Sequence, residues 1–428
     1  MLILYNLLLP FLLAGFRFAG LFNPKIKRGL SGRIGLIGQI KAHYDSATIS
    51  GLRILIHVAS YGELEQAKPI ISGIKQHYPN AHIHLTFFSP SGYDNVIGKF
   101  KDAGIISYLP LDSRSEVSAF LDIAKPDLVL FTRYDVWPNF AAELARRDTP
   151  TLLFAATATA NSRRMMPLVQ SLHKQTYSRL TKILTISEED RAAFIGLGVN
   201  SDHVSIGGDT RFDQVAARKA LVENADHLLP EAIRQSIEEK GTLVFVVGSA
   251  WPEDEGIIRS SLEQSIERGD NILSIIVPHE PTDSHVRSLL ATYPEKAIRF
   301  SEIVRYDGEP VIVVDSIGKL FGLYRYADIA MIGGGFSAGV HNVLEAAVWG
   351  VSVIVGPNHK KSQEVQRMID GLAAFQVTTA REFDFTFWQL VQSEDLRETT
   401  GEKGRGFVET HRGATERIME EVAKLLPS

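Results

Sequence analysis

The chain has 428 residues, of which 45% are hydrophobic and 22% are charged, and its formal net charge is −5. This length exceeds what one hydrophobic core normally holds, and the composition is that of a globular protein, so we expect two domains. The negative charge argues against a general nucleic-acid binder. The absence of cysteine excludes disulfides, thiolate metal sites and cysteine nucleophiles.

The first 22 residues, MLILYNLLLPFLLAGFRFAGLF, carry a single charge, at Arg17. They lack the basic start and the clear cleavage site of a secretory signal. The apolar stretch before Arg17, about 16 residues, is marginal for crossing a hydrocarbon core of ~30 Å. Residues 23–53 are rich in lysine and arginine, and such a flank favours the cytoplasmic side and attracts anionic headgroups. We expect residues 1–22 to anchor the protein, either across the membrane or in its interface; a buried first helix is the alternative.

Short β-type runs alternate with helical patterns along the rest of the chain. We predict strands at 53–59, 81–89, 104–111, 127–133, 151–156, 182–187, 242–250, 271–279, 310–316, 327–335 and 351–357. This alternation predicts parallel sheets with helices on both faces. The fold class is therefore α/β, with two Rossmann-like doubly wound domains at 23–208 and 209–428, the second including the C-terminal helices. A long polar helix at 214–240 would open the second domain, and ligands would bind in the cleft, beyond the carboxyl ends of the strands.

The stretch HVASYGELEQ places Glu63 at the mouth of a helix that follows a predicted strand. A carboxylate in a first helical turn is stabilised by the helix dipole by about 0.3–1 kcal/mol and needs no further function. The same position, at the carboxyl end of a strand in a doubly wound sheet, also suits a catalytic group. The local sequence leaves both interpretations open.

A glycine-rich turn, IGGGFSAGVHNVLEAA, follows the strand predicted at 327–335. Consecutive glycines let the backbone approach a ligand, and a helix start offers N–H groups to an anion. The match to G-x-G-x-x-G is weak, and its carboxylate comes too soon after the glycines for a dinucleotide site. Close packing alone is the alternative. The polar residues beside the turn favour a phosphate-and-ribose site: Ser337, His341, Asn342 and Glu345.

Four further loops follow predicted strands. In GSAWPEDE (248–255), three acids open a helix, which the helix dipole explains without a ligand. DSIGKLFGLYRYAD (315–328) contains a glycine turn whose amides could reach a nucleotide, RYDVWPN (133–139) places a carboxylate before a tryptophan, and SPSGYD (89–94) offers hydroxyls. No H-E-x-x-H, G-x-S-x-G, Walker loop or paired-histidine spacing is present, and we expect neither a metal nor a cofactor.

Taken in order from about residue 20 to about residue 370, these stretches resemble the 3-deoxy-D-manno-octulosonic acid (Kdo) transferases. The resemblance rests on FNPKIKRGLSGR, HVASYGELEQAKPII, VWPN, SEEDRAAFIGLGV, GGDTRFD, DSIGKLFGLYRYADIAMIGGG and GVHNVLEAAVWGVSVIVGPNHKKSQEV. It implies a GT-B glycosyltransferase at the cytoplasmic face of a Gram-negative inner membrane. Its partners would be CMP-Kdo, a lipid A precursor and the membrane surface, without nucleic acid, and the transfer would invert the anomeric carbon.

The resemblance also implies roles for particular residues. Glu63 matches the family's catalytic base, and Asp135 keeps a second carboxylate at the site. The residues that match donor and CMP positions or lie in the neighbouring loops are Arg211, Ser249, His279, Gly318, Gly334, Gly335, His341, Asn342 and Glu345. Those expected to contact the acceptor are Ser60, Gly62, Ser89 and Ser91.

The chain departs from the family's pattern at a few of these positions. Arg133 and Tyr134 stand where the family has glutamate and threonine, Arg211 replaces a lysine, and Lys319 replaces a glutamate. His279 is what remains of a Pro-Arg-His motif. Two alternatives follow: a membrane-associated GT-B transferase that uses a nucleotide-activated hexosamine, such as a lipid disaccharide synthase, and a nucleotide-sugar binding protein without catalysis.

Overall fold

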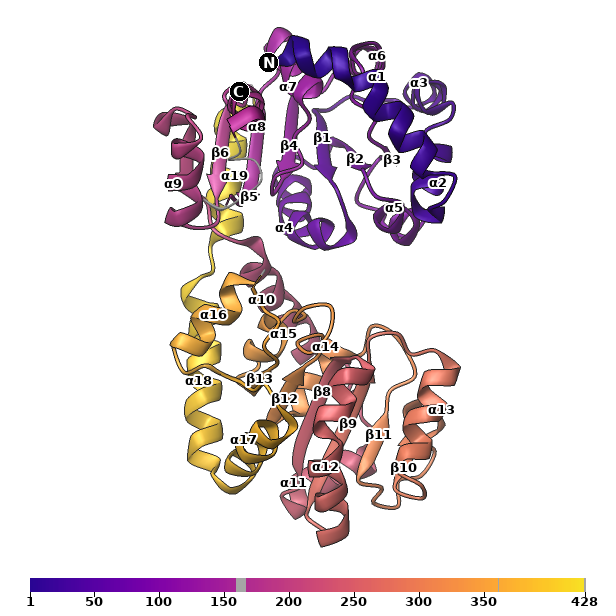
Figure 1. The fold of residues 1–428 in the computed structure, drawn as a ribbon, viewed down its shortest axis with the longest axis vertical. Coiled ribbons are helices and arrows are strands. Elements are labelled where there is room, and N and C mark those ends of the chain that lie inside the picture. Colours follow the sequence, from indigo (N-terminus) through magenta and orange to yellow (C-terminus); the bar gives the residue numbers. More distant parts are fainter. Residues whose placement is uncertain (159–166, 361, 427–428) are drawn as a thin grey trace. The chain divides into compact units, whose positions relative to one another are not determined.

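The computed structural model describes residues 1–158, 167–360 and 362–426. The chain forms two compact units. The first contains Met1–Gln214 together with His411–Ser428, and the second contains Val215–Thr410. Each unit has a parallel sheet with helices packed around it (Figure 1).

The first unit is built on a sheet that has seven strands within the described residues, in the order β3-β2-β1-β4-β5-β6-β7. The strands are β1 (Arg53–Val58), β2 (His82–Phe87), β3 (Ile105–Tyr108), β4 (Leu128–Thr132), β5 (Thr151–Ala156), β6 (Lys182–Thr185) and β7 (Val204–Ile206). The helices are α1 (Leu2–Ala19), α2 (Pro24–Ser31), α3 (Leu36–Ser46), α4 (Tyr61–His77), α5 (Pro90–Val96), α6 (Arg114–Ala124), α7 (Pro138–Arg146), α8 (Pro167–Tyr177), α9 (Glu188–Gly196), the 3₁₀ turn η2 (Ser201–His203) and α19 (Ala414–Leu425).

The second unit repeats this architecture, again with seven parallel strands among the residues described, in the order β10-β11-β9-β8-β12-β13-β14. The strands are β8 (Leu243–Ala250), β9 (Ile272–Pro278), β10 (Ala297–Arg299), β11 (Val311–Val313), β12 (Ile329–Ile332), β13 (Ser352–Val355) and β14 (Ala374–Gln376). The helices are α10 (Thr210–Glu223), which begins in the first unit, α11 (Glu231–Lys240), α12 (Pro252–Arg268), α13 (Asp283–Thr292), α14 (Leu320–Leu323), α15 (Leu344–Ala347), α16 (Gln363–Asp370), α17 (Ala380–Gln392), α18 (Glu394–Thr410) and the 3₁₀ turns η3 (Phe300–Glu302) and η4 (Tyr324–Tyr326).

The predicted α/β class, with two doubly wound parallel sheets, is confirmed. Each of the predicted strands has a counterpart, because these strands are buried and read as apolar runs. The prediction missed β7, β10 and β14. All three have only three residues and lie at sheet edges, where short strands are usual and leave no periodic pattern.

The structure divides the chain differently from the predicted domains at 23–208 and 209–428. The carboxylate of Asp213 accepts the N–H groups of Gly413 and Thr415, both at 2.6 Å, and thereby holds the start of α19 on the first unit. The side chains of Ile418 and Val422 then complete the core formed by β1, β2 and α4. The predicted helix at 214–240 is two helices, α10 and α11, because Pro230 precedes the second and cannot continue the first.

Each sheet has a topological switch point, where the winding of the chain reverses. In the first sheet β1 lies beside β4, and in the second β8 lies beside β12 (Figure 1). Ligands of doubly wound sheets bind at the carboxyl ends of such strand pairs. The loops that follow these four strands are therefore the places where functional residues are expected.

Helix α1 has two different faces. On one, the Tyr5 hydroxyl donates to Asp112 at 2.9 Å, and the Asn6 and Asn139 amides exchange hydrogen bonds. On the other, large apolar side chains are exposed: Ile3, Leu4, Leu7, Leu8, Phe11, Leu12 and Phe18. By length and composition α1 could cross a membrane. It is nevertheless fastened along one side to the first unit.

Replacing Tyr5 with phenylalanine should loosen α1. Burial raises the pKa of Asp112 to about 6, and at neutral pH its ionised carboxylate also accepts the backbone N–H groups of Asn139 and Phe140. A hydrogen bond to a charged group is worth about 1.5–3 kcal/mol. We expect Tyr5→Phe to lower the free energy of unfolding by this amount and to speed amide exchange in α1. Tyr306→Phe, which removes a bond to the Glu309 carbonyl, should leave exchange in α1 unchanged.

Candidate active site

Glu63 lies in the first turn of α4, after the carboxyl end of β1. Its side chain is only 5% exposed, and Oε2 accepts the Ala59 N–H at 2.6 Å. Ser60, the N-cap residue of α4, makes no side-chain capping hydrogen bond within the described structure. The Glu63 carboxylate therefore stabilises the start of α4. It has a structural role in addition to any chemical one.

The environment of Glu63 favours its protonated form more than water does. Burial is the largest cause and raises the pKa of the carboxyl above its ordinary value. The neighbouring Asp135 carboxylate raises this pKa further. The Ala59 N–H, His57 and Arg133 act in the opposite direction without cancelling the rise. Desolvation thus outweighs the position at a helix start, and the result is a carboxylate with increased affinity for a proton.

Asp135 is connected to the core through His57, which is fully buried. The Thr86 hydroxyl donates to the Ile56 carbonyl at 3.3 Å, so its oxygen must accept the proton on His57 Nδ1, 3.0 Å away. His57 Nε2 lies 3.1 Å from Asp135 Oδ2. This contact holds the Asp135 carboxylate just beyond the carboxyl end of β4.

The predicted acceptor residues come together around Glu63. The Ser89 N–H donates to the Ala59 carbonyl at 2.9 Å, which joins the loops that follow β1 and β2. Ser89 and Ser91 share a hydroxyl–hydroxyl bond of 2.9 Å. Ser60 and Gly62 belong to the start of α4, in the same turn as Glu63. The carboxyl ends of β1, β2 and β4 therefore carry one polar cluster.

Arg133 takes up an unusual backbone conformation at the end of β4. Its φ is +63°, and its N–H donates to the Phe154 carbonyl at 2.9 Å. Its guanidinium lies over the Tyr134 ring, 5.6 Å from the centroid. Among the described residues, its buried Nε has no hydrogen-bond partner. Arg133 thus places a cation close enough to Glu63 to lower the pKa of that carboxyl.

In the second unit, the glycine turn after β12 is held by a protein carboxylate. Asp254, fully buried in the first turn of α12, accepts the Gly334 N–H at 2.7 Å and the Phe336 N–H at 3.4 Å. Gly334 has φ +84°, and a Cβ there would lie 2.2 Å from the Gly339 carbonyl oxygen. Two amides of the turn that was predicted to bind an anionic ligand are thus bound to a protein carboxylate. The turn closes on Asp254 and needs its glycines for packing.

Three aromatic rings stack beside this turn. His279, after β9, lies over Trp251 with centroids 4.7 Å apart and over His341 with centroids 4.6 Å apart. Trp251 Nε1 donates to His341 Nε2 at 3.0 Å. Burial lowers the pKa of His341 to about 4, with His279 as the smaller cause, so this imidazole is neutral at physiological pH.

The other predicted donor residues lie in several parts of the structure. Ser249 has φ +54° at a register shift between β8 and β9, next to the glycine turn. Asn342 Oδ1 accepts the Leu344 N–H at 3.2 Å. Glu345 receives a bond from Arg218 at 3.2 Å. Arg211 belongs to the first unit, where it pairs with buried Asp209.

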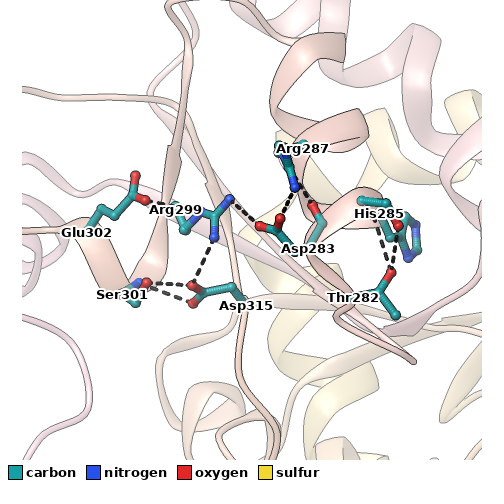
Figure 2. A network of polar contacts seen from close by, with 9 residues as sticks. Thr282, Asp283, His285, Arg287, Arg299, Ser301, Glu302 and Asp315 are labelled. Carbon is teal, nitrogen blue, oxygen red and sulfur yellow. Dashed lines mark hydrogen bonds and ion pairs between the residues drawn. The ribbon is translucent and has the colours of Figure 1, made fainter.

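Gly318 lies in the loop that follows β11, with φ +89° and open space around its α-carbon. A polar network holds the start of this loop (Figure 2). Arg299 bonds Asp283 at 3.2 Å and faces Asp315 at 3.9 Å, and Asp315 also accepts the Ser301 hydroxyl at 2.5 Å. The network fixes residue 315, three positions before the glycine.

Sequence reasoning missed three residues of these sites. His57 begins the stretch HVASYGELEQ, and no role was predicted for it from the sequence. The signal that could have found it is a lone histidine within a buried strand. Trp251 and Asp254 were in a loop whose acids were attributed to the helix dipole. Asp254 does cap its own helix, through the Trp251 N–H at 3.0 Å. Its second partner, the glycine turn, lies 80 residues away in sequence and left no local signal.

Two doubly wound parallel sheets, each with a polar cluster at its switch point, define the GT-B class of fold. The crystal structure of UDP-GlcNAc 2-epimerase from Neisseria meningitidis bound to UDP-GlcNAc resembles this chain with a TM-score of 0.61. The match covers 87% of this chain and 99% of that one at 16% identity. Such a likeness shows a shared fold.

The sequence comparisons relate the chain to one family of enzymes. Residues 28–214 match the family model of 3-deoxy-D-manno-octulosonic-acid transferase (kdotransferase). The 3-deoxy-D-manno-octulosonic acid transferase of Haemophilus influenzae is 26% identical over 407 residues, which are 93% of this chain and 91% of the relative. That of Chlamydia pneumoniae is 26% identical over 408 residues, 94% and 90% of the two chains. The chain is therefore similar to Kdo transferases over most of its length.

Proposed function

We propose that this enzyme transfers Kdo from CMP-Kdo to a lipid A precursor, lipid IVA, with inversion at the anomeric carbon. The observation that carries the proposal is Glu63, a buried carboxyl with a raised pKa at the switch point of the first sheet. A base whose pKa is brought towards the working pH contributes about 10²–10⁴-fold to a proton-transfer step. Similarity to the Kdo transferases supports the choice of sugar.

The reaction is written as a single displacement. Glu63 takes the proton of the acceptor hydroxyl while the hydroxyl oxygen forms its bond to the anomeric carbon of Kdo. The bond between that carbon and the phosphate oxygen breaks, and CMP leaves with the electron pair. One displacement without a covalent intermediate inverts the configuration. Asp135 acts through Glu63, since its charge raises the pKa of the base.

The decisive experiment is an assay of the purified full-length enzyme in detergent. Incubation with CMP-Kdo and a tetraacylated lipid A precursor should yield products whose mass increases by whole Kdo units. UDP-activated hexosamines should give no product. Turnover of a UDP-sugar in place of CMP-Kdo would point to the hexosamine alternative, and CMP binding without any product would point to a binding protein.

We also propose that α1 anchors the enzyme to the cytoplasmic face of the inner membrane. Its outer face exposes Leu7 (68%) and Phe11 (74%), and Phe22 (75%) lies just beyond its end. An amphipathic helix of this kind binds in the interface through buried apolar area. The exposed lysines Lys25 and Lys27 would add attraction to anionic headgroups. Arg33 adds little to this surface, because it is half-buried and donates to backbone carbonyls.

Charges placed on this outer face should release the enzyme from lipid. We expect Leu7→Glu/Phe11→Glu to lose most of its sedimentation with phosphatidylethanolamine–phosphatidylglycerol vesicles, since a carboxylate cannot enter the apolar layer cheaply. Leu221→Glu is the matched control, because Leu221 is equally exposed (74%) but lies on α10. Equal sedimentation of the double variant and the control would contradict the proposal that α1 binds the membrane.

A further inference from the structure

The ring of His341 is held on three sides by the protein. His279 covers one of its faces, and Trp251 Nε1–H donates to Nε2 at one edge. At the Cδ2 edge lies Gly334, where an added Cβ would come within 3.1 Å. The His341 backbone N–H is bound to the Gly333 carbonyl at 3.1 Å. The one ring nitrogen left for another partner is Nδ1.

The contact with Trp251 determines which nitrogen of His341 carries the proton. An indole N–H can only donate, so Nε2 must be the acceptor and must be unprotonated. A neutral imidazole holds its single proton on the other nitrogen, which makes Nδ1–H a donor. Within the described residues, no protein acceptor is bonded to that Nδ1–H. Asp254 meanwhile occupies the Gly334 and Phe336 amides, which removes the obvious backbone donors for an anion.

We propose that Trp251 is a positioning residue that fixes His341 as the Nδ1–H tautomer, so that this N–H donates to the phosphate of the nucleotide donor. The inference rests on the proposed function, because it takes CMP as the ligand. Free histidine favours the opposite tautomer, with the proton on Nε2. Without Trp251, the His341 nitrogen facing the phosphate would be a lone pair, which repels an anion.

The test uses the full-length protein with ¹⁵N-labelled histidine. In the wild type, the His341 signals should report a protonated Nδ1 and a bare Nε2; in Trp251→Phe, which keeps an aromatic ring under His279, they should shift toward protonated Nε2. CMP binding measured by calorimetry should weaken by about tenfold to a hundredfold, the value of a hydrogen bond to a charged group. Trp388→Phe removes a comparable indole bond, to Asp384, and should change neither quantity.

A double-mutant cycle separates positioning from a general structural role. An asparagine amide can place an N–H where Nδ1 stands without any tautomer to fix. In the His341→Asn background, adding Trp251→Phe should therefore cost CMP binding less than threefold. An additive loss would overturn the inference, as would wild-type CMP affinity in Trp251→Phe alone.

If a variant fails to fold, measurements on the wild-type protein still test the proposal. A proton found on His341 Nε2 in the wild type overturns the inference, whatever CMP does. A wild type that has the Nδ1–H tautomer but does not bind CMP contradicts the proposed donor, and with it the phosphate assigned here. The tautomer of His341 and the identity of the nucleotide donor are therefore tested by separate measurements.

Discussion

The Glu63→Gln enzyme is expected to fold, to bind CMP and to lose about 10²–10⁴-fold in transfer rate, because its amide cannot take the acceptor proton. Glutamine keeps an oxygen that can accept the Ala59 N–H, so the start of α4 retains its cap. Alanine removes both the base and the cap. Comparing the two variants therefore separates the chemical role of Glu63 from its structural one.

The pH dependence gives a second readout of the same residue. Burial raises the pKa of Glu63, and a protonated base is inactive, so kcat/KM should fall as the pH falls through that pKa. This acid limb should lie above the one that an ordinary glutamate, with a pKa of about 4.3, would give. The residual activity of Glu63→Gln should lack it.

Stability should move in the opposite direction to activity. A carboxyl whose pKa is raised by folding contributes stability below its unfolded-state pKa, and that stability is lost as the pH rises through the folded-state pKa. Glutamine stays neutral at every pH. At pH 7, Glu63→Gln should therefore unfold at the same temperature as the wild type or at a higher one.

The control lies on the same helix. Glu65 pairs with Lys68 at 2.5 Å and accepts a bond from Gln214, and it is not among the proposed catalytic groups. Glu65→Gln should change the transfer rate less than threefold, while Glu63→Gln loses it. Full activity in Glu63→Gln, with CMP-Kdo and a lipid A precursor as substrates, would remove Glu63 as the base.

The sequence predicted the elements that bury large apolar surfaces and missed those that do not. The strands β1 and β8 were evident from their continuous apolar runs. The return of α19 to the first unit was not, because its apolar residues Ile418 and Val422 would fit either core. The Asp213 carboxylate holds α19 on the first unit by accepting the Gly413 N–H. These residues are 200 positions apart in the sequence, so their contact leaves no local pattern.

The candidate site follows the same rule. Glu63 could be singled out because it follows a strand, but the rise in its pKa comes from burial and from Asp135, which only the fold brings near. Close backbone approach was predicted for Gly334 and Gly335, and both lie against backbone atoms of other residues. The sequence did not indicate that Asp254 would accept the N–H groups of Gly334 and Phe336 in this turn.

This arrangement makes Asp254 the side chain on which the second site depends most. Its carboxylate accepts the N–H groups of Trp251, Gly334 and Phe336, and so ties the start of α12 to the turn after β12. Asp254→Ala leaves these groups unpaired in a site closed to water. Each unsatisfied buried donor costs about 1–3 kcal/mol. We expect the free energy of unfolding to fall by about 3–6 kcal/mol and CMP binding to be lost.

Urea denaturation followed by tryptophan fluorescence can measure this loss, because Trp251, Trp349 and Trp388 report on the second unit. Glu253→Ala is the matched control: it removes a carboxylate from the same helical turn, where the dipole is worth about 0.3–1 kcal/mol. Asp254→Asn keeps one acceptor oxygen but turns an NH₂ toward a donor, so its loss should fall between the two. If Asp254→Ala were as stable as Glu253→Ala, the carboxylate would be a helix cap alone, and the glycine turn would have to be held by its own packing.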